Sequence, residues 1–295
     1  MMNKSLFFIH WSVFMFGMAG LFGKLVSLPA MAVTLGRVGF SSLTLFIYLK
    51  IRNQRFTLNE KQHCIRLIAA GVLLAFHWSA FYYSIQVSTV AVGLLSSATF
   101  PVFTMFLEPI FFHEKFRFRN ALLALLALIG ILLMSPLTGG EPANLKGIIW
   151  GIIAGGSYAC ITMMNRAHMQ WGYPSALITF YEQATAAAVL FFVTLLTVRA
   201  VPTPRDLFLL FILGSVFTAF AHSLFINGLK NITAHTSGLI SCMEPVYGII
   251  FAFILLGEKP ELRVIIGGVL ILSVSVFQSL IQSRGINRGI GRRIC

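Results

Sequence analysis

Glu244 lies inside the apolar run HTSGLISCMEPVYGIIFAFILLGEK (235–259) and is followed directly by Pro245. About eleven helical residues of its span precede it, or roughly 16 Å, which is near the middle of a bilayer. A charge at that depth is costly unless it is paired, hydrated or protonated, so such residues usually mark a substrate or ion site. We predict that Glu244 binds the amine of a substrate or carries a coupling proton. The alternative is a glutamate that bonds a neighbouring helix only to fix packing.

Five further side chains in apolar runs join an apolar body to a polar tip, and we expect them to line a cavity with Glu244. They are His77 and Trp78 in AFHWSAFYYSIQ (75–86), Tyr158 in GIIAGGSYACITMM (151–164), and His222 and Asn227 in TAFAHSLFINGLK (218–230). His222 can titrate near neutral pH, although a buried histidine with satisfied hydrogen bonds is the commoner case.

Three more charges lie within apolar runs. Arg37 and Glu182 each stand about eight residues into corresponding runs of the two halves of the chain, and two buried opposite charges favour an ion pair. Pairing of either residue with other groups is the alternative. Glu108 lies nearer the end of its run, and we interpret it as a packing or gating group near the cytoplasmic mouth. The four cysteines are scattered without metal-site spacing, so we predict no metal and no cofactor.

The elements that position these residues are membrane-spanning helices. Of the 295 residues, 57% are hydrophobic and 11% are charged, against roughly 25% charged in soluble domains. The apolar runs are close to the length of about 20 residues that a spanning helix needs, and they show no polar face at helical period, which excludes a soluble helical protein. We predict an all-α polytopic membrane protein with ten spans, at about 5–27, 30–50, 65–86, 89–112, 118–136, 146–166, 174–198, 206–229, 233–256 and 261–281.

The basic residues predict an orientation. The formal net charge is +13, but the Lys and Arg residues lie between the apolar runs, which is typical of membrane topology rather than of nucleic-acid binding. Most of them fall on one side when both termini are placed in the cytoplasm. We therefore expect a multi-pass protein of the cell membrane, in a bacterium the inner membrane, with both termini cytoplasmic.

The two halves of the chain resemble each other. FPVFTMFLEPIFFHEK (100–115) aligns with EPVYGIIFAFILLGEK (244–259), so that Pro101 meets Pro245 and each segment ends in Glu-Lys. We predict that both prolines kink their helices. Each half contains five spans, and because five is odd, the second half must cross the membrane inverted relative to the first. The predicted organisation is a five-helix repeat at 1–140, a second one at 141–282, and a basic cytoplasmic tail at 283–295.

On these features the chain resembles the EamA family of the drug/metabolite transporter superfamily. The matching segments are SSATFPVF…HEK (96–115), LISCMEPVY…GEK (239–259) and the glycine-containing FMFGMAGLFGK (14–24). The resemblance implies two inverted five-helix repeats around a central cavity. It also implies a carrier that works by alternating access and most often exports amino acids or related compounds. The halves depart from each other at one point, since Phe100 precedes the first proline where Glu244 precedes the second.

Other functions stay open at this point. A nucleotide-sugar or sugar-phosphate exchanger of the same superfamily would need several cations at mid-membrane depth, where only Arg37 clearly lies. A passive channel is a second alternative. An intramembrane enzyme is a third, but the chain has no GxSxG or HExxH motif, so we predict that it is not an enzyme. The expected partners are a small-molecule substrate and the lipid bilayer, with protons as a candidate coupling ion and no nucleic acid, in a monomer or homodimer.

Overall fold

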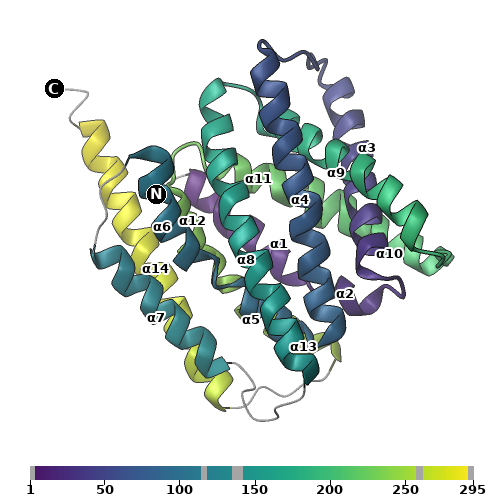
Figure 1. Ribbon diagram of the computed structural model, residues 1–295. Helices are drawn as coiled ribbons and strands as arrows, with labels where there is room; N and C mark the ends of the chain where they lie inside the picture. The colour runs from purple at the N-terminus through teal and green to yellow at the C-terminus, as the bar shows by residue number, and fades with distance from the viewer. Residues whose placement is uncertain (1–3, 114–117, 135–141, 257–261, 292–295) are drawn as a thin grey trace.

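The computed structural model describes residues 4–113, 118–134, 142–256 and 262–291, and every secondary-structure element in these ranges is helical (Figure 1). In the first half the helices are α1 (Lys4–Ala19), α2 (Phe22–Leu25), α3 (Ala30–Ile51), α4 (Lys61–Val87), α5 (Val90–Ser97), α6 (Phe100–Phe112) and α7 (Phe118–Met134). In the second half they are α8 (Pro142–His168), the 3-10 turn η1 (Met169–Trp171), α9 (Ser175–Thr197), α10 (Pro204–Gly214), the π-helical segment η2 (Ser215–Phe220), α11 (Ala221–Gly228), α12 (Ala234–Ser241), α13 (Met243–Leu256) and α14 (Leu262–Gly291).

Eight helical stretches in the described chain are long and apolar enough to cross a membrane, and two shorter apolar helices, Phe118–Leu133 and Ile265–Gln278, accompany them. These ten stretches coincide with the ten predicted spans, so the prediction of an all-helical membrane protein is confirmed. The helix α14 continues to Gly291, through most of the segment assigned to the basic tail. The predicted helix-ending Glu-Lys pairs at 114–115 and 258–259 lie outside the described residues.

Along the spans, the outward-facing side chains are mostly apolar, and buried polar side chains face the interior. On α9, for example, Leu196 is 85% exposed and Leu195 is 69% exposed, whereas Glu182 and Gln183 on the same helix are fully buried. Lipid-facing apolar side chains with an interior polar set are what a bilayer requires, because hydrocarbon offers no partner to a polar group.

Two spans are each broken into two helices just before a proline. The α5–α6 span is interrupted at Ala98 and Thr99, before Pro101, and the α12–α13 span at Cys242, before Pro245. Both prolines therefore occupy the first turn of a new helix, where a missing backbone N–H costs little. The two breaks touch each other, since the Cys242 Sγ lies 3.8 Å from the Ala98 carbonyl oxygen. The predicted kinks are thus complete interruptions, and the interruptions meet.

Helices of the first half pack mainly on helices of the second. Figure 1 shows α4 beside α8 in the centre and α7 beside α14 at one edge, and α3 also packs along α9. In the same way, α1 packs against α11 and α13. Pairing of α4 with α8 corresponds to pairing of α11 with α1 when the halves are superimposed in order. The core is therefore an interface between the two halves, and side chains from both meet there.

Candidate functional site

A small cavity lies at this interface. It measures about 40 Å³ and is lined by Phe16, Ala19, Arg37, His77, Trp78, Phe81, Leu94, Ser97, Ala98, Phe100, Tyr158, His222, Ser241 and Glu244. Such a volume holds a few water molecules, whereas pockets for organic ligands measure roughly 300–1,000 Å³. The cavity in this structure is therefore much smaller than the usual site of an organic ligand.

Five of the six predicted binding residues lie on this cavity: Glu244, His77, Trp78, His222 and Tyr158. Asn227 is not among the lining residues. It follows His222 by five positions on α11, and at about 100° per residue it projects roughly 140° away from that histidine. The expectation that both face the cavity does not hold, because the two residues lie on different faces of one helix.

Glu244 stands in the first turn of α13, directly after the helix break at Cys242. Its side chain is half-buried, and within the described part of the chain no hydrogen bond or ion pair reaches its carboxylate. A carboxylate that lines a cavity without a protein partner is available to a ligand. Its position at the start of a helix adds the favourable dipole of that helix end.

Arg37 faces the same cavity from α3 and is held from three sides. Its Nε donates to the Thr218 Oγ1 at 2.8 Å, its Nη1 donates to the Tyr82 hydroxyl at 3.0 Å, and its guanidinium lies 4.0 Å from the centre of the Trp78 ring. Thr218 is presented by the π-helical segment η2, where its hydroxyl also bonds the Leu213 carbonyl. π-helical turns are rare and frequent at functional sites.

The predicted ion pair between Arg37 and Glu182 is not formed among the described contacts. Arg37 donates its hydrogen bonds to residues of α4 and η2, whereas Glu182 contacts residues of α8 and α11. The Glu182 Oε2 lies 3.4 Å from both the Asn165 Nδ2 and the His222 Nε2, and its Oε1 lies 3.8 Å from the His168 Nδ1. The helices α3 and α9 pack against each other, but the side chains of Arg37 and Glu182 point in different directions.

Aromatic rings form much of the cavity wall. The His77 ring stacks on Tyr158 at 5.0 Å between centroids, and Phe100 meets Tyr158 edge-on at the same distance. The His77 Nδ1 lies 2.8 Å from the Ala154 carbonyl oxygen, which fixes the ring. The buried Tyr158 hydroxyl has no hydrogen-bond partner within the described ranges. The Oγ of Ser241, which also lines the cavity, is likewise without a partner in these ranges, so the wall offers apolar faces and two spare hydroxyls.

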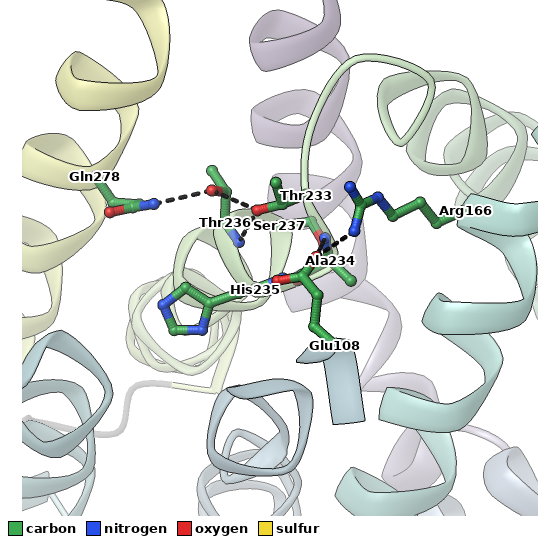
Figure 2. A network of polar contacts seen from close by, with 8 residues as sticks. All are labelled: Glu108, Arg166, Thr233, Ala234, His235, Thr236, Ser237 and Gln278. Atoms are coloured by element: carbon green, nitrogen blue, oxygen red, sulfur yellow. Dashed lines mark hydrogen bonds and ion pairs between the residues drawn. The ribbon is translucent and has the colours of Figure 1, made fainter. Parts of the chain in front are cut away.

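A second polar network, away from the cavity, involves Glu108 (Figure 2). The Glu108 carboxylate accepts hydrogen bonds from the Arg166 Nη1 at 2.6 Å, from the Ala234 backbone N–H at 2.8 Å and from the His235 backbone N–H at 3.3 Å. It thus caps the first turn of α12, which belongs to the other half of the chain. Glu108 was expected to serve packing or gating, and the structure gives it a defined anchoring contact.

The network extends to the last helix. Thr233 caps α12 through its own Oγ1, and the Gln278 Nε2 of α14 donates to the Thr236 Oγ1 at 2.8 Å. The sequence signalled Glu108 as a charge in an apolar run, but it contained nothing to indicate Arg166 or the start of α12 as its partners.

The family follows from comparison with known proteins. The model of the EamA-like transporter family matches residues 3–135 and again 145–280, which together cover most of the chain in two copies. The chain belongs to the EamA-like transporter family. This EamA protein is therefore a membrane transporter and not an enzyme. No group of three His, Cys, Asp or Glu side chains in the described ranges has the arrangement of a metal site.

Relatives of the EamA protein are distant. It is 22% identical to the uncharacterized transporter YxxF of Bacillus subtilis, over 89% of this chain and 85% of that one. It is 23% identical to an S-adenosylmethionine uptake transporter of Rickettsia felis, over 88% of this chain and 86% of that one. A solved structure described only as a crystal structure of a protein superimposes with a TM-score of 0.80 at 14% identity, covering 96% of this chain and 98% of that one, which shows a shared fold.

Proposed function

We propose that this transporter moves a zwitterionic small metabolite, an amino acid or a related compound, across the cytoplasmic membrane by alternating access, in the direction of export. The observation that carries the proposal is that Arg37 and Glu244 line the same cavity with opposite charges and form no ion pair with each other in the described structure. Two fixed, separate, opposite charges complement a ligand that carries both an ammonium and a carboxylate group.

Each end of such a ligand has a partner. A guanidinium offers five N–H donors, and the two hydrogen bonds of Arg37 to Thr218 and Tyr82 leave others for a substrate carboxylate. Glu244 would accept from the ammonium group. The side chain of the ligand would lie among Trp78, Phe100 and Tyr158, whose rings favour apolar and cationic groups.

The relatives are compatible with this substrate class. S-Adenosylmethionine, which the Rickettsia felis protein is named for taking up, carries an α-ammonium and an α-carboxylate group. It is therefore one candidate ligand for the cavity, with uptake as the alternative direction. Sugar phosphates are less suitable, because Arg37 is the single Lys or Arg among the cavity-lining residues.

We further propose that the two halves are inverted in the membrane with both termini in the cytoplasm. The excess of Lys and Arg on one side supports this orientation. The matched packing of α4 with α8 and of α1 with α11, together with the paired helix breaks, supports a two-fold relation between the halves. In this arrangement, opening on either side requires only that the halves exchange conformations.

The test is counterflow in proteoliposomes made with the full chain. Vesicles are loaded with one unlabelled compound at a time, from the twenty amino acids and S-adenosylmethionine, and exchange of the same labelled compound is measured. We expect exchange with at least one compound, and Glu244→Gln should reduce it at least tenfold, because a buried ammonium loses its charged partner.

Two further variants sharpen this test. Arg37→Lys keeps the positive charge but loses the planar guanidinium, which can donate two parallel hydrogen bonds to a carboxylate. This variant should therefore also weaken exchange. Asn227→Ala is the matched control, since Asn227 lies on a different face of α11 and does not line the cavity, and should exchange at the wild-type rate. Undiminished exchange in Glu244→Gln, or no exchange with any of the compounds, would overturn the proposal.

A further inference from the structure

We propose that Glu182, His168 and His222 form a proton-binding site that serves as the coupling site of the transporter. This inference rests on the proposed transport function but concerns residues outside the substrate-binding pair Arg37 and Glu244. Glu182 is fully buried, and His168 and His222 are 2% and 1% exposed. One carboxylate between two imidazoles, buried inside the bundle, is a group that can take up and hold a single proton.

Two facing atoms of the cluster lack hydrogen-bond partners among the described residues, and a proton between them would form the missing hydrogen bond. The Glu182 Oε1 and the His168 Nδ1 face each other at 3.8 Å, and neither has a hydrogen-bond partner in the described structure. The Asn165 Oδ1 beside them is also unpartnered. A small movement that closes this gap around a proton would satisfy two buried atoms, whose isolation is otherwise costly.

Charge balance points to the same group. Arg37 and Glu244 offset each other around the cavity, and Glu108 is paired with Arg166 at 2.6 Å. Within the described ion pairs, Glu182 meets no Lys or Arg, and its basic partners are the two histidines. A buried carboxylate without a counter-charge is strongly disfavoured, and one proton on the cluster, on the carboxylate or on an imidazole, removes the imbalance.

The site communicates with the cavity through His222. That histidine lines the cavity, meets the Trp78 ring edge-on at 5.6 Å and lies 3.4 Å from the Glu182 Oε2. A ligand that fills the cavity therefore changes the surroundings of one member of the proton site. Such a differential contact is what coupling between two bound species requires.

On the opposite side, the cluster approaches the end of the bundle where α4 begins. The His168 ring stacks on Trp171 at 4.4 Å, and Trp171 stacks in turn on His63 at 3.8 Å. His63 is partly exposed and lies 3.7 Å from the exposed Glu60. The indole ring thus separates the buried imidazole from one that water reaches, so that displacement of Trp171 would open the site to that side.

The elements packed around Glu182 carry few other groups that could titrate or contribute charge. Toward the middle of these helices they are Arg37 on α3, His77 and Tyr82 on α4, Tyr158 and the free Cys160 on α8, and Tyr181 on α9 itself. Arg37, His77 and Tyr82 are held by contacts elsewhere, and Tyr181 donates to the Phe56 carbonyl oxygen. The two histidines are therefore the groups that share the proton with Glu182.

The experiment is solid-state NMR of the full chain in lipid bilayers, labelled with 15N-histidine and 13C-glutamate, between pH 5 and 9. The seven histidines are assigned by single His→Gln variants. We expect the resonances of His168, His222 and Glu182 to change together with one midpoint, whichever atom holds the proton. In Glu182→Gln, the two imidazoles should lose that midpoint or shift it by at least one pH unit.

The chain offers a matched control and a test of folding. Glu60→Gln removes a carboxylate that lies 3.7 Å from His63 at the surface, and it should leave the resonances of the buried cluster unchanged. Unchanged resonances of the buried His77 show that Glu182→Gln is folded. If that variant does not fold, Glu182→Asp replaces it. Because aspartate keeps the carboxylate, the joint midpoint should then be retained. The proposal is overturned if His168 and His222 do not titrate with Glu182, or if they titrate identically in Glu182→Gln. Because no substrate is added, this outcome is independent of the counterflow result.

Discussion

Replacement of Glu108 by glutamine should weaken the attachment between the two halves of the transporter. Among the described contacts, the carboxylate accepts a hydrogen bond from the Arg166 guanidinium and two more from the first backbone N–H groups of α12. An amide keeps one acceptor oxygen, but it loses the charge and turns two donors toward a site that already supplies donors.

The magnitude can be worked from these contacts. A hydrogen bond to a charged group contributes about 1.5–3 kcal/mol, and each weakened backbone bond about 0.5–1.5 kcal/mol. Arg166 is partly exposed, with 16% of its side chain accessible, so the charged bond belongs at the lower end. The sum for Glu108→Gln is about 3 kcal/mol of unfolding free energy, or roughly a hundredfold in the unfolding equilibrium.

The assay is equilibrium unfolding in mixed detergent micelles, followed by tryptophan fluorescence. Glu60→Gln is the control, since Glu60 also pairs with a basic side chain but is 63% exposed, and should cost less than about 1 kcal/mol. A double-mutant cycle with Arg166→Met isolates the pair and should give a coupling energy above about 1 kcal/mol. If Glu108→Gln costs no more than Glu60→Gln, the carboxylate does not anchor α12 and the reasoning fails.

Two further predictions use the same unfolding assay. Gly17→Ala should lower the free energy of unfolding by about 1–3 kcal/mol, because the new Cβ would lie 2.7 Å from the Tyr247 Cβ and 2.9 Å from the Glu244 carbonyl oxygen. The control is Gly39→Ala, whose Cβ would meet nothing within 4 Å, and it should be neutral or stabilising. Equal effects of the two substitutions would contradict the close packing of α1 on α13. Asp206→Ala should cost about 2 kcal/mol, since this carboxylate completes the capping box of α10 with Thr203 and accepts from the Ser27 N–H at 2.9 Å, and a loss below 0.5 kcal/mol would show that the cap is dispensable.

The spans and the central acid were predictable for a simple reason. Bilayer thickness sets the length of an apolar run, so composition alone locates the helices, and a glutamate in the middle of such a run is conspicuous. The prolines were equally clear, since Pro101 and Pro245 occur at matching places in two similar halves. These features depend only on neighbouring residues in the sequence, so they can be recognised without knowing how the helices pack.

Contacts between helices were not predictable in the same way. Arg37 and Glu182 lie on helices that do pack together, yet the rotation of each helix sends their side chains to different partners. His168 stands at the last turn of α8, beyond the predicted span at 146–166, although it is buried beside Glu182. The position of Asn227 was also not predictable. It is close to His222 in the sequence, but it lies on a different face of α11.

The meeting of the two helix breaks has a consequence for how such a chain could have arisen. Ala98 and Cys242 are equivalent positions of the two halves, and they touch each other, as equivalent residues do on the axis of a symmetric dimer. The next equivalent pair on the cavity wall is Phe100 and Glu244. Two identical half-length subunits would have placed two glutamates there, and like charges in a small closed space repel strongly. With both halves in one chain, the position equivalent to Glu244 can carry Phe100 instead, so the two sides of the cavity can differ in chemistry.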